Sequence, residues 1–211
     1  MTAAAAPTMP DPLPLFPLQT VLFPGGLLPL KVFEARYLDL ISHCLRAREP
    51  FGVACIIRGN EAGSASEGMR IEAVGVLAHL EEVDAEQAGI LKVSCTGGSR
   101  FRLLQVPVQR PDGLWVGTAK AVPDDDVVEP EPVFAATVQA LKEAADALAV
   151  QGVRAIGQPY RWADAGWVAN RWSELLPVSL VAKQRLMELE DPVARLRLVD
   201  EFLRNRRVHQ G

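Results

Sequence analysis

The sequence has few cysteines, and their spacing fits neither a disulfide framework nor a metal site. Its 211 residues include three cysteines, Cys44, Cys55 and Cys95. An odd number of cysteines, without a C-x-x-C pair and without a matching histidine pattern, argues against paired disulfides and against structural zinc. We therefore predict buried, reduced thiols, and the sequence indicates no metal and no cofactor.

Long apolar stretches are missing as well. No stretch approaches the roughly 20 apolar residues that a membrane-spanning helix requires. The first residues, MTAAAAPTMPDP, have neither a charged n-region nor a continuous apolar h-region. We therefore predict that residues 1–12 are a disordered leader rather than a signal peptide, and that the protein is cytoplasmic and does not bind membranes.

Positive charge is scarce. Lys and Arg number 22 against 26 Asp and Glu, which gives a net charge of −4. Nucleic acids and anionic membranes are bound by clustered basic surface, so the composition disfavours both as partners. The locally basic stretch near the end contains Arg204, Arg206 and Arg207. We interpret it as a solvated helix end, where positive charge is favourable, with a phosphate-binding patch as the alternative.

Known catalytic and nucleotide-binding motifs are also missing. The sequence has no G-x-S-x-G, no H-E-x-x-H, no P-loop and no G-x-G-x-x-G that opens a helix. His43, His79 and His209 are scattered, and the neighbours Glu81 and Glu82 would face opposite sides of a strand. We therefore predict no catalytic residues and a protein that is not an enzyme.

Residues 13–37 combine several prolines with many apolar residues. Prolines remove backbone donors, so residues 13–37 can form short edge strands and turns. The stretch Phe23-Pro24-Gly25-Gly26 has the composition of a turn. Apolar residues then follow a helical period from about residue 33 to residue 49, and Pro50 ends that helix.

Residues 51–122 have the pattern of successive strands without intervening helices. The apolar stretch FGVACIIR is typical of a strand that is buried on both faces. The stretch RIEAVGVLAHLEEV contains Gly75, where we expect a bulge or a sharp bend. Strands this closely spaced indicate a small closed or sandwich-like β domain over residues 13–122.

The C-terminal part has a different composition. Residues 123–132, PDDDVVEPEP, predict an acidic connector that is solvated, with a metal site at Asp124–Asp126 as the alternative. Residues 133–205 contain helical stretches with Gly152, Ser179 and Asp191 at capping positions. We predict a helical bundle there, a tail at residues 206–211, and an α+β fold class.

Aromatic residues are few, at 6% of the sequence, but several are close together and lie among arginines. Such side chains bury a large area with few rotors, which is why they anchor protein interfaces. The alternative is that they seal a loop against the core, with Trp167 as the strongest candidate for an exposed contact. An open groove bordered by the aromatic candidates would support the first interpretation, and complete burial of all of them would exclude it. The candidate binding residues are Trp115, Tyr160, Arg161, Trp162, Trp167 and Arg171.

Several short stretches, in order along the chain, resemble the Lon N-terminal domain, also called the Lon substrate-binding domain. In the first half they are LPLFPL, VLFPG, LPL, FEARY, FGVA, RIEAVGVLAHL and GILKVSCTGGSRFRL. In the second half they are VAN before a helix and KQRLMELED. The resemblance implies a PUA-like β barrel followed by a C-terminal helical bundle, which agrees with the two parts expected from strand spacing and helical period.

The resemblance also implies a function. In the Lon protease this domain precedes ATPase and serine-lysine protease domains and helps to engage protein substrates, whereas neither region is present in this sequence. We therefore expect a stand-alone, bacterial-type Lon-domain protein that binds polypeptide segments or a protein partner in protein quality control. One alternative is an RNA-binding protein, by analogy with PUA domains. A second alternative is an unrecognised small-molecule hydrolase.

Overall fold

The computed structural model describes residues 9–58 and 69–208, which form two compact units. The first unit extends to Thr20 and resumes from Leu28 to Val122. The second unit contains Val21–Leu27 and the chain from Pro123 onward. A short segment near the start of the chain therefore belongs to the C-terminal unit. Among the described residues, none of the helices could span a membrane.

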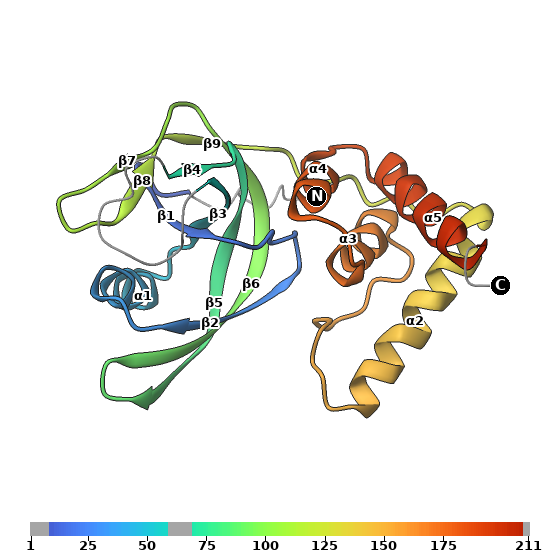
Figure 1. Ribbon diagram of the computed structural model, residues 1–211, viewed down its shortest axis with the longest axis horizontal. Coiled ribbons are helices and arrows are strands. Elements are labelled where there is room, and N and C mark those ends of the chain that lie inside the picture. Colours follow the sequence, from blue (N-terminus) through green and yellow to red (C-terminus); the bar gives the residue numbers. More distant parts are fainter. Residues whose placement is uncertain (1–8, 59–68, 209–211) are drawn as a thin grey trace, which may run out of the picture. The chain divides into compact units, whose positions relative to one another are not determined.

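The first unit is built on a mixed nine-stranded sheet and one helix (Figure 1). Its elements are β1 (Leu13–Leu18), β2 (Leu27–Val32), α1 (Ala35–Ala47), β3 (Phe51–Arg58), β4 (Arg70–Ile71), β5 (Val74–Gln87), β6 (Ile90–Leu103), β7 (Val108–Gln109), β8 (Trp115–Gly117) and β9 (Ala119–Ala121). The strand order is β2-β6-β5-β3-β1-β8-β7, while β4 pairs with β3 and β9 pairs with β6. Strands β1 and β3 are parallel, and β5 and β6 form a long antiparallel hairpin.

The α+β class is confirmed, but the sheet is not closed into a barrel. In the described part of the chain, the terminal strands of the sheet order, β2 and β7, are not paired with each other. Strand β7 is two residues long, and Pro29 leaves β2 without one backbone donor. Two such strands offer few hydrogen bonds for closure, so the sheet remains open between them.

The core of the first unit contains a cluster of buried apolar side chains: Leu13, Leu15, Ala54, Leu77, Phe101 and Leu103. Gly75 lies against this cluster, in register with Phe101. A Cβ atom at Gly75 would lie 2.3 Å from the carbonyl oxygen of Val53 and 2.6 Å from the Phe101 ring. Close packing therefore explains this glycine, while the irregularity in pairing lies next to it, between Val76 and Ala78.

The second unit is helical. It contains the 3-10 turn η1 (Pro132–Phe134) and the helices α2 (Ala135–Val150), α3 (Ala165–Leu175), α4 (Leu180–Glu188) and α5 (Pro192–Val208). Ser179 caps α4 by accepting from the Ala182 amide at 3.2 Å, and Asp191 caps α5 by accepting from the Val193 amide at 2.9 Å. Both caps were predicted from the sequence. The core of this unit includes Phe134, Leu141, Val168, Ala169 and Leu196.

The acidic connector is fastened to the helices of its own unit. Asp125 forms an ion pair with Arg195 at 2.6 Å, and the Arg195 side chain is 1% exposed. Arg195 also donates to the side-chain oxygen of Asn170 at 3.0 Å and to the Leu186 carbonyl at 2.9 Å. Asp125 is therefore a partner of a buried cation rather than part of a fully solvated linker, whereas Asp126 is exposed.

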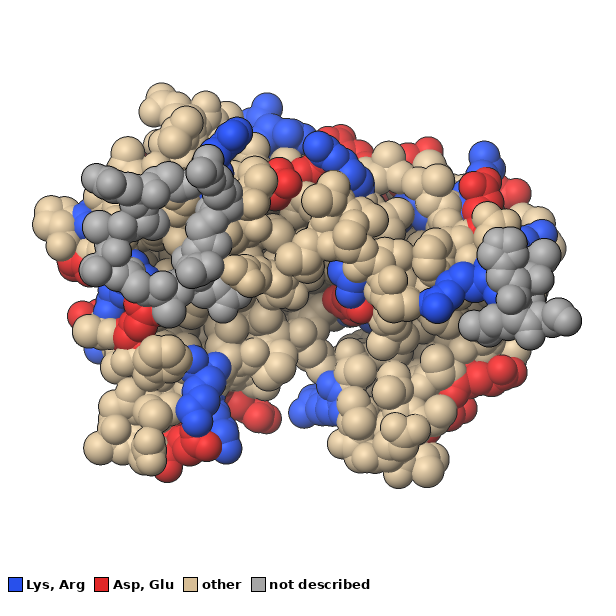
Figure 2. Space-filling model, in the orientation of Figure 1, with Lys and Arg blue, Asp and Glu red and all other residues tan. Residues whose placement is uncertain are grey.

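Charged side chains of both signs are interspersed on the face that Figure 2 shows, outside the grey residues. Several of them pair, as Glu86 does with Lys31 at 2.9 Å and with Lys92 at 3.0 Å. Nucleic-acid-binding domains concentrate Lys and Arg on one surface. On the side chains visible in this view, the charge is mixed rather than concentrated.

Candidate functional site

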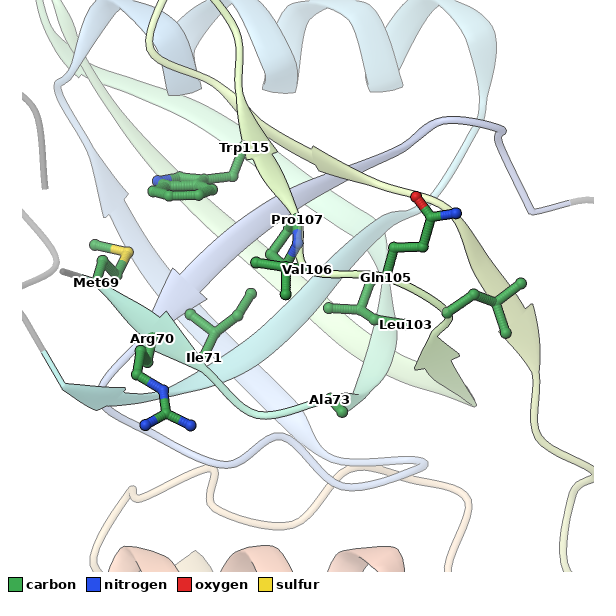
Figure 3. A pocket seen from close by; sticks show the side chains of 10 residues that line it. Met69, Arg70, Ile71, Ala73, Leu103, Gln105, Val106, Pro107 and Trp115 are labelled. Atoms are coloured by element: carbon green, nitrogen blue, oxygen red, sulfur yellow. The ribbon is translucent and has the colours of Figure 1, made fainter. Parts of the chain in front are cut away.

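The first unit contains an open pocket of about 590 Å³, which is our candidate site (Figure 3). Three parts of the chain build it: the start of β4 with the bend that follows, the connection from β6 to β7, and the first residue of β8. The lining residues are Met69, Arg70, Ile71, Ala73, Leu103, Leu104, Gln105, Val106, Pro107 and Trp115.

Backbone hydrogen bonds hold the walls of the pocket. The Leu103 amide donates to the Ala73 carbonyl at 2.8 Å, which joins the end of β6 to the bend after β4. The Leu104 amide donates to the Thr118 carbonyl at 2.9 Å, which joins the β6–β7 connection to the end of β8. Pro107 has no amide to add to a ladder, so β7 starts only at Val108. These hydrogen bonds therefore hold the β6–β7 connection in place, and the connection forms one wall of the pocket.

The pocket opens from the core of the unit to the surface. Leu103 belongs to the buried apolar cluster, and Ile71 and Trp115 pack against that cluster. On the outer side, Leu104 is 54% exposed and Val106 is 87% exposed. Apolar side chains that are exposed beside an apolar pocket are typical of ligand and protein interaction sites. The geometry therefore favours a ligand with apolar groups.

Polar groups are few at this site. Of the described residues that line the pocket, Arg70 alone has a charged side chain, and it is exposed. Gln105 adds an exposed amide. The indole nitrogen of Trp115 is buried and lacks a hydrogen-bond partner among the described residues. A buried donor without an acceptor is unfavourable.

Of the predicted binding residues, the pocket contains Trp115. The other candidates, Tyr160, Arg161, Trp162, Trp167 and Arg171, belong to the second unit. Tyr160, Trp162 and Trp167 pack on one another, with ring centroids 4.9 Å apart for Tyr160–Trp162 and 5.0 Å apart for Trp162–Trp167. Trp167 is 5% exposed, so it is not the exposed contact that the sequence suggested.

The two predicted arginines have partners inside the second unit. Arg171 is fully buried and donates to the carbonyls of Pro24 and Gly25 and to the Glu174 carboxylate, the last at 3.0 Å. Burial lowers the pKa of Arg171. Arg171 therefore fastens the Phe23–Gly26 turn to α3. Arg161 is exposed and lies 3.6 Å from the Asp164 carboxylate.

None of the described residues that line the pocket is a cysteine, a histidine, a serine or a carboxylate. The three cysteines are buried, as predicted. Burial raises the pKa of the Cys44 thiol to about 11 and that of the Cys95 thiol to about 12, so neither is a ready nucleophile. His43 lies 3.4 Å from the Glu49 carboxylate in another part of the unit. In the described residues, no cluster of His, Cys, Asp or Glu could hold a metal ion.

Sequence reasoning missed most of this pocket. Strand β6 ends at Leu103, and the next four residues form the connection to β7. The adjacent leucines Leu103 and Leu104 break the strict alternation of a half-buried strand, and Pro107 interrupts the strand as well. Those two irregularities were the available signal. No local pattern links them to Met69 or Ile71.

The chain is thus an α+β protein with an open, largely apolar pocket on its mixed sheet. It belongs to the family of ATP-dependent protease La (LON) substrate-binding domains, because the model of that family matches residues 12–205. The resemblance seen in the sequence is therefore confirmed.

Similar proteins agree with this assignment. A Lon protease of Anaeromyxobacter dehalogenans (strain 2CP-C) and Lon protease 2 of Myxococcus xanthus are each 27% identical, in alignments of 209 residues that cover 94% of this chain. The chain spans 24% of the length of each of these relatives.

Solved structures agree as well. A crystal structure of a Lon N-terminal domain protein from Xanthomonas campestris is 32% identical, with a TM-score of 0.70 over 89% of this chain and 95% of that one. The N-terminal domain of a Mycobacterium avium complex Lon protease has a TM-score of 0.57 over 90% of this chain and 96% of that one. At 17% identity, this second likeness concerns the fold alone.

Proposed function

We propose that this protein binds polypeptide segments, as substrates or partners in protein quality control in the cytoplasm, and that it does so without catalysing a reaction. The observation that carries the proposal is the open apolar pocket lined by Ile71, Leu103, Val106 and Trp115. Membership in a family of substrate-binding domains supports it. The aromatic and arginine residues of the second unit are left with structural roles in this proposal.

The physical basis of binding is the removal of apolar surface from water. Burying one large apolar side chain contributes about 1.5–3 kcal/mol relative to leaving it exposed. An extended segment that places such a side chain in the pocket would also cover Leu104 and Val106, which are exposed in the unliganded protein. Unfolded chains present such side chains, whereas folded proteins bury most of them.

The test compares two exposed valines, one in the pocket and one outside it. Val106 is 87% exposed in the pocket wall, and Val127 is 75% exposed in the connector of the second unit. The ligand is a labelled, chemically unfolded model protein, and its affinity is measured by fluorescence anisotropy. We expect Val106→Asp to weaken binding about fivefold or more, because a carboxylate would have to be desolvated, and Val127→Asp to leave binding unchanged.

Two results would contradict the proposal. In the first, the unaltered protein does not bind the unfolded chain while a known binder does so in the same assay. In the second, both valine variants bind as the unaltered protein does. Thermal unfolding of each variant, followed by circular dichroism, verifies that a loss of binding does not come from a loss of folding.

A further inference from the structure

Arg70 is the charged group at the rim of the pocket. It is the first residue of β4 and is exposed, and it makes no ion pair with another described residue. Two other arginines of the first unit do form ion pairs: Arg36 pairs with Glu34 at 2.7 Å, and Arg110 pairs with Asp112 at 2.7 Å. Arg70 therefore offers five N–H donors at the edge of an apolar site.

Among the described residues that line the pocket, Arg70 has the one charged side chain. The others are apolar, apart from the amide of Gln105 and the indole of Trp115, and none of these described residues has a carboxylate. A ligand with a carboxylate near its apolar groups would thus meet a cation, whereas a ligand with a lysine or arginine there would meet a like charge. Guanidinium is weakly hydrated and matches a carboxylate with two parallel hydrogen bonds.

The position of Arg70 limits where that carboxylate lies. Figure 3 shows the Arg70 guanidinium on the side of the pocket away from Trp115, with Ile71 between them. A side chain that packs against Trp115 is therefore on the other side of Ile71 from Arg70 in this view. Another residue of the same segment can pair with Arg70, because successive residues of an extended chain advance by about 3.3 Å.

We propose that the pocket selects acidic apolar segments: polypeptide stretches in which an apolar side chain enters between Ile71 and Trp115 and an Asp or Glu nearby in the sequence pairs with Arg70. This inference rests on the proposed function, since it names the class of polypeptide that the same pocket takes. The occupant is an extended chain rather than a small amphiphile, because the exposed Leu104 and Val106 extend the apolar lining of the pocket to the surface of the unit.

The experiment uses three labelled peptides that share one apolar sequence and differ at one flanking position, which is Asp, Asn or Lys. Binding to the full chain is measured by fluorescence anisotropy at low and high salt. We expect the Asp peptide to bind about two- to fivefold more tightly than the Asn peptide, and the Lys peptide to bind most weakly. Added salt should reduce these differences, because the pair is exposed to solvent.

Variants at Arg70 separate a pairing role from a structural one. Arg70→Gln should abolish the preference for Asp over Asn. Arg70→Lys should retain part of the preference, because it keeps the charge but loses the planar fork. The matched control is Arg46→Gln, since Arg46 is exposed on α1 and does not line the pocket. That variant should behave as the unaltered protein does.

The outcomes distinguish this inference from the proposed function. If none of the peptides binds, or if Val106→Asp changes none of their affinities, the proposed function fails. If all three peptides bind equally and Val106→Asp weakens them all, the proposed function stands and the role of Arg70 is overturned. Tighter binding of decanoate than of the Asp peptide would overturn the assignment to polypeptide.

Discussion

At the scale of single residues, Gly26 illustrates how a turn depends on a distant side chain. The sequence predicted the Phe23–Gly26 turn, and the structure confirms it with a hydrogen bond of 2.9 Å from the Gly26 amide to the Phe23 carbonyl. Gly25 has a φ of +71°, which favours glycine. Gly26 is required for another reason: a Cβ atom there would lie 2.2 Å from the Glu174 carboxylate and 2.9 Å from the Phe23 carbonyl oxygen.

Gly26→Ala is therefore expected to destabilise the protein by about 1–3 kcal/mol, the usual cost of inserting an atom into a packed site. Urea unfolding followed by circular dichroism measures the effect. The cost should be smaller in a Glu174→Ala background, because the nearest clashing atoms are then gone while the Phe23 contact remains. An equal cost in both backgrounds would show that Glu174 is not the obstacle.

At the scale of elements, one buried arginine joins several parts of the helical unit. Arg195 of α5 contacts Asp125 of the connector, Asn170 of α3 and the carbonyl of Leu186 in α4. A buried guanidinium is tolerated only when its donors are satisfied, and Asp125 supplies the compensating charge. The acidic run was interpreted from the sequence as solvated, because nothing local distinguishes Asp125 from its neighbours.

Asp125→Asn is expected to lower the free energy of unfolding by about 1–3 kcal/mol, because it removes the charge while nearly keeping the shape. The neighbouring Asp126→Asn is the matched control. Asp126 is exposed, so its replacement should change stability by less than about 0.5 kcal/mol. Chemical denaturation of both variants provides the comparison, and similar effects at the two positions would argue against a specific role of the Asp125–Arg195 pair.

At the scale of the whole molecule, one carboxyl links stability to pH near neutrality. Burial raises the pKa of Glu174 to about 7 from its ordinary value of 4.5, against the opposing effects of Arg171 and Lys183. The folded protein therefore binds a proton there more readily than the unfolded chain does. The resulting stabilisation is complete below about pH 4.5 and is lost as the pH rises through about 7.

We thus expect the contribution of Glu174 to make stability fall as the pH rises from about 5 to about 7, with a slope of at most about 1.4 kcal/mol per pH unit. Glu174→Gln should flatten this part of the stability profile, because the amide does not titrate. Denaturation midpoints at a series of pH values measure the slope. An unchanged slope in the variant would assign the pH dependence to other groups.

The family, the α+β class and the helix caps could be predicted from the sequence because each depends on local information. Ser179 and Asp191 bond to amides two or three residues away, so their roles follow from their position before a helix. The pocket could not be predicted in this way. Its walls come from three separate stretches, and residues such as Met69 and Val106 have no local feature that marks them as lining one site.

The sequence by itself determined the fold class, the turn at Phe23–Gly26 and the family, since period, capping and turn chemistry act over a few residues. Only the tertiary structure decided that the sheet remains open and that Arg171 and Arg195 are buried and hydrogen-bonded to several segments of the helical unit. It also decided that Trp115 lines a pocket while Trp167 is buried. The physical reason is that burial and pairing depend on which distant residues meet. These tertiary contacts arise from the packing of the whole chain, and no short sequence pattern predicts them.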